Sequence, residues 1–349
     1  MTDTQIHAAF YRGDRRFDVA QKPAPAPGPG QVALRIAFCG ICGTDMHVFH
    51  GNMDARVGFE RIIGHEMSGT VEALGAGVEG FTKGQKVVVR PLDHCGDCPA
   101  CDAGHTHICH NLKFLGLDTD GAMQEVWNVP AHTLHALPDD MRLDHAALIE
   151  PVAVACHDVR MADLTAGEDV VVIGGGPIGV LVAMVAREAG GKVVISEVNE
   201  NRLAIAADMG FDVVNPAKSD LVAEIGNRTG GKGADVVYDS VGGDAFAAAS
   251  RFMAPGGRLL VIGFASGEIP KLPVNLTLVK EYAVVGVFWG NWTRREPAAY
   301  LANMDELFGW YTDGKIKPLI EGRYPLAEAA DVLKRVLGRG AVGKLALVP

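Results

Sequence analysis

The chain has 349 residues, of which 48% are hydrophobic and 21% charged, a balance that excludes an intrinsically disordered protein. Its net charge of −10, without basic clusters, argues against nucleic acid or an anionic membrane as a partner. The length predicts roughly two domains at about 150 residues each. Because the start at Thr2-Asp3 lacks a basic and then apolar leader, we expect a cytoplasmic protein.

The first part of the chain, residues 1–150, is predicted to be mostly β with many loops. Its short apolar runs, such as residues 32–38 and 86–90, are separated by turn residues. Alternating prolines before Gln31 predict an extended entry into this part rather than a helix.

Two sets of metal-binding side chains fall in this first part. Cys42 is followed by Thr44, Asp45 and His47, and then by His65-Glu66, while Glu150 comes much later. A thiolate, an imidazole and a carboxylate are suitable zinc ligands, and fewer than four protein ligands leave room for water or substrate. This set therefore has the composition of an open, catalytic metal site.

The second set consists of four cysteines with gaps of two, two and seven residues: Cys95, Cys98, Cys101 and Cys109. A tetrahedral zinc ion with four sulfur ligands suits this spacing, and such a closed set leaves no position for chemistry. An iron–sulfur cluster is the alternative, although the typical fourth spacing with a following proline is absent. Since four thiolates complete the zinc site, the neighbouring histidines are predicted to be solvated: His94, His105, His107 and His110.

After about Glu150, predicted strands alternate with predicted helices, which indicates a doubly wound parallel sheet. The predicted strands are residues 170–173, 192–197, 235–239, 258–262 and 284–288. The predicted helices are residues 178–189, 201–209 and 220–227. Farther on, we expect helices at 299–311 and 326–337 and a last strand at 343–348, which could pair back with the first part.

The turn after the first of these strands carries the pattern Gly174-x-Gly176-x-x-Gly179. In this strand–turn–helix context the pattern predicts a site where a dinucleotide pyrophosphate meets a helix N-terminus. Glu197 lies 18 residues after Gly179, at the end of the next predicted strand, where a carboxylate can accept the ribose hydroxyls and repel a 2′-phosphate. This favours NAD over NADP, whereas Arg202 nearby could tolerate the phosphate.

The order of these motifs resembles the zinc-dependent medium-chain dehydrogenase/reductase family, within the alcohol dehydrogenase superfamily. The resemblance rests on residues 40–47, the signature 64–69 with Gly75 and Val78, the four cysteines and the glycine turn. It is strongest to the branch of sorbitol, threonine and butanediol dehydrogenases. It implies a Rossmann nucleotide-binding domain at 151–294, a mostly β, GroES-like catalytic domain at 1–150 with a structural zinc lobe, and a return to it at 295–349. It also implies a homotetramer.

The resemblance further implies roles for individual residues. Cys42, His65 and Glu66 would bind a catalytic zinc, with Glu150 reaching it through water or intermittently. Thr44 and His47 would relay a proton, and Asp45 would orient His65. The residues that would bind the dinucleotide are Gly174, Gly176, Pro177, Ile178, Gly179, Glu197, Arg202, Gly263, Phe264, Val287 and Phe288.

We therefore expect an oxidoreductase with two zinc ions per chain that transfers a hydride between NAD and a secondary alcohol, polyol or sugar-derived alcohol. Residues 286–292 instead resemble zinc-free quinone reductases, and Trp289 stands where polyol dehydrogenases have an arginine. An NADPH-dependent quinone or enone reductase is thus one alternative, and a non-catalytic zinc- and nucleotide-binding protein is another. Phe49, Trp289 and Trp292 could form an aromatic substrate wall or be plain core or interface residues.

Overall fold

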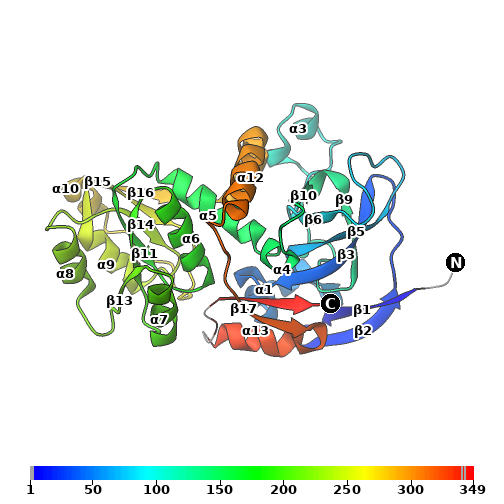
Figure 1. Cartoon of the computed structure of the whole chain (residues 1–349), viewed down its shortest axis with the longest axis horizontal. Helices are drawn as coiled ribbons and strands as arrows, with labels where there is room; N and C mark the ends of the chain where they lie inside the picture. The colour runs from blue at the N-terminus through cyan, green and yellow to red at the C-terminus, as the bar shows by residue number, and fades with distance from the viewer. Residues whose placement is uncertain (1–3, 339–340, 342) are drawn as a thin grey trace. The chain divides into compact units, whose positions relative to one another are not determined.

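The computed structural model describes residues 4–338, 341 and 343–349, so the sequence prediction at Thr2 and Asp3 lies outside the described residues. The chain divides into two compact units (Figure 1). The first unit comprises residues 1–150 and 290–349, and the second comprises residues 151–289. Among the described residues, no helix combines the length and the apolar character that a membrane crossing needs.

The first unit is built on antiparallel β-structure, as the alternation of short apolar runs predicts. Its largest sheet has the order β10-β6-β5-β3-β18-β17, with β9 also paired to β3, and smaller sheets have the orders β2-β1-β4 and β7-β8. The strands are β1 Gln5–Tyr11, β2 Phe17–Pro23, β3 Gln31–Gly40, β4 Arg61–Ile62, β5 Glu66–Leu74, β6 Lys86–Val89, β7 Leu92–Asp93, β8 Lys113–Phe114, β9 Val126–Pro130, β10 Leu134–Ala136, β17 Ile320–Pro325 and β18 Lys344–Val348.

The last strand joins the first part of the chain, as predicted. Ala346 of β18 lies opposite Gly40 of β3, and Gly40 lies opposite Glu66 at the start of β5. This register brings the C-terminal strand close to the Cys42–Glu66 segment. The helical elements of this unit are α1 Gly43–Phe49, α2 Asp54–Val57, α3 Pro99–Asp102, η1 Thr106–Ile108, η2 Ala131–Thr133, α4 Leu143–Ala146, α12 Pro297–Thr312, η3 Leu326–Glu328 and α13 Ala329–Leu337. Two more helices cross its boundaries, α5 Ile149–Met161 and α11 Trp289–Arg295.

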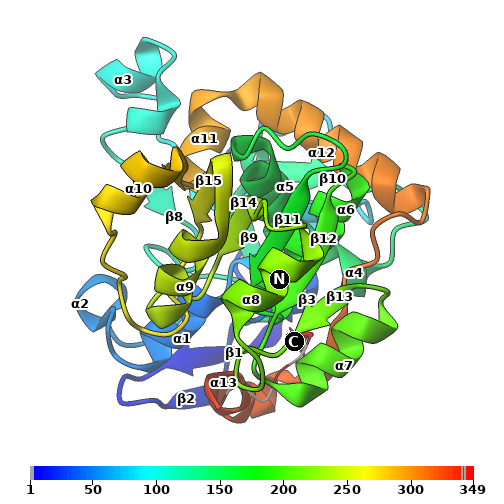
Figure 2. The same ribbon diagram turned by 90° about the vertical axis from the view of Figure 1, so that its left-hand side faces the viewer.

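The second unit, every residue of which is described, is a six-stranded parallel sheet with the order β13-β12-β11-β14-β15-β16. Figure 2 shows the strands in this order from β15 to β13. The order reverses between β11 and β14, which is the switch point of a Rossmann sheet. The strands are β11 Asp169–Ile173, β12 Lys192–Ser196, β13 Asp212–Val214, β14 Ala234–Asp239, β15 Met253–Val261 and β16 Ala283–Gly286.

Helices cover both faces of this sheet, with α6 on one side and α8 and α9 on the other (Figure 1). Val171, Val237 and Leu259 point from the sheet into a core shared with α8 and α9. The helices are α6 Pro177–Glu188, α7 Glu200–Asp208, α8 Leu221–Arg228, α9 Asp244–Phe252 and α10 Val274–Lys280. The predicted fold class, a Rossmann sheet with a GroES-like β domain, is confirmed.

The structure corrects several predicted elements. The strand predicted at 284–288 ends at Gly286, and the helix predicted at 326–337 begins with the short 3-10 turn η3. From β11 onward, five elements were not predicted: β13, α9, α10, α11 and β17. Two of them are short strands in which polar residues or Gly322 and Pro325 interrupt the apolar pattern.

Candidate active site

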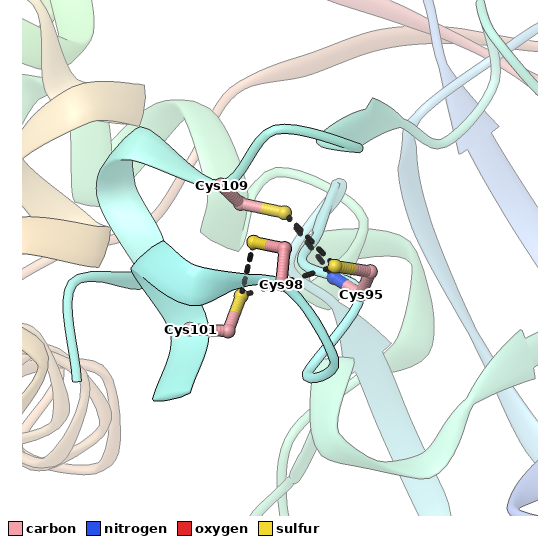
Figure 3. Close-up of side chains that lie close together, drawn as sticks. All are labelled: Cys95, Cys98, Cys101 and Cys109. Atoms are coloured by element: carbon pink, nitrogen blue, oxygen red, sulfur yellow. Dashed lines mark hydrogen bonds between the residues drawn. The ribbon is translucent and has the colours of Figure 1, made fainter. Parts of the chain in front are cut away.

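The four cysteines lie together in a lobe formed by α3, η1 and the loops beside them (Figure 3). The Sγ–Sγ distances are 3.5 Å for Cys109–Cys95, 3.6 Å for Cys98–Cys101 and 4.0 Å for Cys95–Cys101. A zinc ion about 2.3 Å from four tetrahedral sulfurs would place them about 3.8 Å apart. The four-cysteine lobe, residues 95–109, therefore has the geometry of a closed zinc site.

Backbone and side-chain amides surround the sulfurs of this lobe. The Cys95 N–H donates to Cys109 Sγ at 3.4 Å, and the Asn111 side-chain amide donates to Cys95 Sγ at 3.5 Å. Backbone N–H groups of His110 and Cys101 lower the pKa of Cys98 to about 6. These donors favour the thiolate of Cys98, which is the form that binds zinc, whereas a hydrogen bond with Asp97 raises the pKa of Cys95 and burial raises that of Cys101.

The prediction that the neighbouring histidines are solvated holds only in part for His94, whose side chain is half-buried. Its Nδ1 atom is buried, and its ring centroid lies 4.6 Å from that of His132. The side chains of His105 and His110 are exposed, and that of His107 is half-buried.

The second set begins at the N-terminus of α1, where Cys42 is the cap residue. The Cys42 N–H donates to Asp45 Oδ2 at 2.8 Å, which fixes a buried carboxylate beneath the thiol. Asp45 Oδ1 lies 3.7 Å from His65 Nδ1, too far for a hydrogen bond, and both atoms are buried without a partner. This is the arrangement in which a carboxylate orients an imidazole whose other nitrogen binds a metal.

The position of His65 depends on the glycine before it. Gly64 has a φ of +100°, and a Cβ atom there would lie 2.6 Å from Cys39 Sγ. Any other residue would thus be strained in backbone and clash with the core. The turn leaves the His65 ring 2% exposed, with its edge against Phe114 at a centroid distance of 5.0 Å.

Glu66 is held by a lysine that sequence analysis missed. Lys344 Nζ lies 2.5 Å from both carboxylate oxygens of Glu66 and donates to the Ile41 carbonyl at 3.1 Å. Both side chains are buried. Burial lowers the pKa of Lys344, but Glu66 and Cys42 raise it by more, so the ammonium stays charged. The only signal of this ion pair in the sequence was a lysine in an otherwise apolar last strand.

Glu150, the second residue of α5, is the fourth member of this set and interacts with the other residues through its charge. Burial and the charge of Glu66 raise its pKa to about 7, while His65 and Lys344 act in the opposite direction. Burial, with Glu66 next, also raises the pKa of Cys42. These shifts show several acidic groups competing for little positive charge, which a bound cation would relieve. We call Cys42, His65, Glu66 and Glu150 the open cluster.

The ligand atoms of the open cluster are not packed as tightly as those of the lobe. Among the described residues, the four cysteines are the only group of three or more such side chains whose ligand atoms all lie within 4.8 Å of one another. In the open cluster, Lys344 takes up both oxygens of Glu66. The donor chemistry and the unpartnered Asp45–His65 pair nevertheless fit a zinc ion.

The residues predicted to relay a proton lie on α1. Thr44 is half-buried, with its Oγ1 atom 3.8 Å from Cys42 Sγ. His47 is exposed one helical turn farther along. The structure thus places one hydroxyl beside the open cluster and one imidazole in contact with water.

In the second unit, the glycine turn lies at the carboxyl end of β11 and opens α6. Gly174 has a φ of +95°, and a Cβ on Gly179 would lie 1.8 Å from the Gly174 carbonyl oxygen. Only glycine allows this close approach of helix and strand. Gly176 caps α6, and Pro177 and Ile178 begin it, so unpaired helix N–H groups face the turn.

Glu197 follows β12 and is 6% exposed. Its carboxylate accepts backbone N–H groups of Gly175, Val198 and Asn199, each at 2.8 Å. The Arg202 guanidinium lies 3.5 Å from the same carboxylate. Glu197 thus fixes the glycine turn to the end of β12, in addition to providing a negative charge there.

The remaining predicted cofactor residues follow the neighbouring strands. Gly263 and Phe264 come just after β15, and Val287 and Phe288 come just after β16, so all four lie at the carboxyl edge of the sheet. Phe264 and Phe288 are exposed. Of the three residues considered for an aromatic wall, Phe49 is fully buried and stacks on Phe17, which makes it a core residue.

Comparisons with known proteins agree with this architecture. Residues 28–139 match the alcohol dehydrogenase GroES-like domain, and residues 177–306 match the zinc-binding dehydrogenase domain. The chain is 54% identical to 2-dehydro-3-deoxy-L-galactonate 5-dehydrogenase of Pseudoalteromonas atlantica over 68% of this chain and 70% of that protein. It is 35% identical to L-threonine 3-dehydrogenase of Pyrococcus furiosus over 79% of this chain and 81% of that protein.

The chain belongs to the zinc-containing medium-chain dehydrogenase/reductase family. Among solved structures, a putative zinc-binding dehydrogenase from Sinorhizobium meliloti 1021 bound to NADP is similar, with a TM-score of 0.87, 28% identity and coverage of 99% of this chain and 100% of that chain. The chain is therefore a dehydrogenase that acts on CH–OH groups, binds zinc through the four-cysteine lobe and uses a nucleotide cofactor. This assignment removes the iron–sulfur cluster, the zinc-free quinone reductase and the non-catalytic protein as alternatives.

Proposed function

We propose that this protein oxidises a secondary hydroxyl group of a small hydroxy acid, in the class of sugar acids, with NAD and a catalytic zinc. The substrate class comes from the relatives, because the galactonate derivative and threonine named above both carry a carboxylate and a secondary hydroxyl group. The observation that carries the catalytic proposal is the open cluster, where distant segments bring sulfur, imidazole and carboxylate donors together.

In this proposal Cys42, His65 and Glu66 would hold the zinc, and Glu150 would reach it through water. Zinc would supply Lewis-acid polarisation of the substrate hydroxyl, and the nicotinamide would accept the hydride. Asp45 orients His65 through its Nδ1 atom, since the two groups are buried 3.7 Å apart. Lys344 pairs with both carboxylate oxygens of Glu66 and fixes the direction of that side chain.

The chain's own residues also provide the route for the proton. Thr44, beside Cys42, is placed to accept the proton of the substrate hydroxyl as a hydrogen-bonding relay. His47, exposed on the same helix, is placed to pass it to water. Glu150, with a pKa raised to about 7, can exchange a proton near neutral pH within the same cluster.

We further propose a preference for NAD over NADP. The buried Glu197 carboxylate at the end of β12 supports it, since a 2′-phosphate near this charge would be repelled. Arg202 offsets part of that charge, so the preference is a matter of degree. The tetramer and the cytoplasmic location stay predictions by resemblance and composition.

The test is an initial-rate assay of the purified holoenzyme with hydroxy acids, neutral polyols and aromatic alcohols, each with NAD+ and NADP+. We expect turnover of L-galactonate or a related sugar acid with NAD+, loss of activity after metal removal, and recovery on adding zinc. Activity that survives removal of both metals, or turnover of neutral alcohols alone, would contradict the proposal.

A further inference from the structure

Two buried arginines of the first unit have no acidic partner among the residues that the structure describes. Arg90, directly after β6, is 9% exposed, and its Nε atom has no hydrogen-bond partner. Its Cζ atom lies 5.8 Å from the centroid of the Tyr300 ring. Arg294 of α11 is 7% exposed and donates only to neutral oxygens, the Gly290 carbonyl at 3.1 Å and the Asn291 side chain at 3.5 Å. Within the described part of the chain, no carboxylate lies within 4.0 Å of either guanidinium.

The polar groups around Arg90 are already engaged elsewhere. Burial lowers the pKa of Arg90, and the charges of Tyr300 and Asp93 oppose this only in part. The Asp93 carboxylate itself lies 3.1 Å from His132 Nε2. The Tyr300 hydroxyl lies 2.8 Å from His135 Nε2. Burial of an unpaired charge is costly, and a second cation nearby adds to the cost. Something anionic must therefore offset these two groups.

The position of Arg294 indicates what that anion is. The Thr106 hydroxyl donates to the Arg294 carbonyl at 3.4 Å, and Thr106 begins the η1 turn that ends just before Cys109. Burial lowers the pKa of Arg294, Arg90 acts in the same direction, and Cys109 opposes them in part, so both residues lie within electrostatic range of Arg294. Arg294 therefore lies beside the four-cysteine lobe, and Arg90 lies near Arg294.

A divalent zinc ion with four thiolates has a net charge of minus two, and two guanidinium groups have a charge of plus two. We propose that Arg90 and Arg294 are the counter-charges of the zinc–tetrathiolate lobe and help to retain its metal. They touch neither substrate nor cofactor in this role, so they are positioning residues that act through the metal-bound sulfurs. The proposal is independent of which hydroxy acid the enzyme oxidises.

The experiment measures metal release from the lobe in the full chain. A Cys42→Ser background removes the thiolate of the open cluster, so that in cobalt-substituted protein the sulfur-to-metal charge-transfer absorption reports the lobe. We expect Arg90→Gln and Arg294→Gln each to speed the loss of this absorption into excess chelator by at least about tenfold. Arg90→Lys and Arg294→Lys, which keep the charge, should change the rate far less.

The matched control is Arg295→Gln on the same helix, whose side chain is 54% exposed and lies 3.6 Å from Glu296. Its release rate should equal that of the background. Unchanged release from both glutamine variants would overturn the proposal. Fast release from the lysine variants would also overturn it, because it would show that packing matters and charge does not. The lysine variants therefore still decide the question if a glutamine variant fails to fold. Normal release, together with a raised KM for hydroxy acids when Arg90→Gln is made in the enzyme that keeps Cys42, would instead assign Arg90 to the substrate carboxylate and would equally overturn the proposal.

Discussion

The four-cysteine lobe and the open cluster both crowd acidic groups into the first unit, but they differ in what offsets the negative charge. The lobe gathers its four sulfurs from 15 residues of chain, and they already lie at zinc spacing. The open cluster gathers its donors from residues 42–150 and holds one carboxylate on Lys344. Local turns can preform a closed site. An open site relies on contacts between distant parts of the chain and on a cationic side chain, here Lys344.

This difference has a functional meaning. A set of ligands that is fully formed before binding leaves no position for substrate, which suits a structural role. A set in which Glu66 is shared with Lys344 and Glu150 stands apart can change its coordination, which suits a site where water and substrate exchange. The predictions below test this contrast, in order of their expected effect on activity.

Removal of the open cluster's thiol should have the largest effect. Cys42→Ser should lower kcat/KM by at least about a thousandfold, because the metal that polarises the hydroxyl is lost or displaced. Elemental analysis should show one zinc per chain in place of two. Cys39→Ala, which changes a buried cysteine three residues earlier, should keep both zinc ions and most activity. Equal loss in both variants would show that the effect is on folding.

Loss of the Lys344 ammonium, which pairs with Glu66, should have the second largest effect on activity. Lys344→Met leaves the buried Glu66 without its ammonium, so activity should fall about tenfold to a hundredfold. The metal-free protein should lose about 3 kcal/mol of unfolding free energy, and the zinc-loaded protein less, because zinc offsets the same charge. Urea unfolding of both forms measures this. The double variant Lys344→Met/Glu66→Gln should regain stability without regaining activity, and failure to do so would contradict a charge-based role.

Loss of the charge of Glu197, the buried acid in the nucleotide-binding unit, should have a smaller effect. It should change the choice of cofactor. Glu197→Gln keeps the shape of the side chain but removes its charge, so KM for NAD+ should rise about tenfold and discrimination against NADP+ should weaken. Steady-state kinetics with both cofactors provide the measurement. Glu200→Gln, a nearby exposed position, should change neither constant. Unchanged constants in Glu197→Gln would refute its role in cofactor choice.

Asp158 provides the reference for these sites, because it is a buried acid that forms no ion pair with any described residue. Both oxygens of Asp158 in α5 lack a hydrogen-bond partner, and burial raises its pKa to about 8. The folded state therefore binds this proton more tightly than the unfolded state, whose carboxyl has a pKa of about 3.9. Stability is thus full below the unfolded pKa and falls as pH rises toward 8.

Between pH 5.5 and 7.5 this group should lower the unfolding free energy by about 2 kcal/mol, with little effect on activity. Asp158→Asn should remove that pH-dependent part when urea unfolding is measured at both pH values. Asp208→Asn, at an exposed site in the same unit, should leave it in place. An unchanged slope in Asp158→Asn would mean that Asp158 is ionised in the folded protein.

The parts of this molecule that could be predicted are those whose residues lie close together in the sequence. The spacing of Cys95, Cys98, Cys101 and Cys109 indicated a zinc lobe, and Gly174 and Gly179 between a strand and a helix indicated the nucleotide turn. In both cases a local turn alone brings the chemistry together. The alternation of strands and helices likewise predicted β11, β12, β14 and β15.

The missed parts depend on partners far apart in sequence. Lys344 meets Glu66 across 278 residues through the register of β18, β3 and β5, which no local pattern encodes. The half-buried His94 lies against His132, which is far from it in sequence, so its sequence neighbours did not indicate this contact. The apolar pair Val287-Phe288 extends the pattern of β16 although the strand has ended, and Phe288 is 72% exposed.

The most direct test of the account is anomalous X-ray diffraction at the zinc absorption edge, on crystals of the holoenzyme with bound NAD+. We predict two zinc peaks per chain, one among the four cysteine sulfurs and one within bonding distance of Cys42, His65 and Glu66. A single peak in the four-cysteine lobe, in crystals whose dissolved enzyme still oxidises its hydroxy acid, would contradict it.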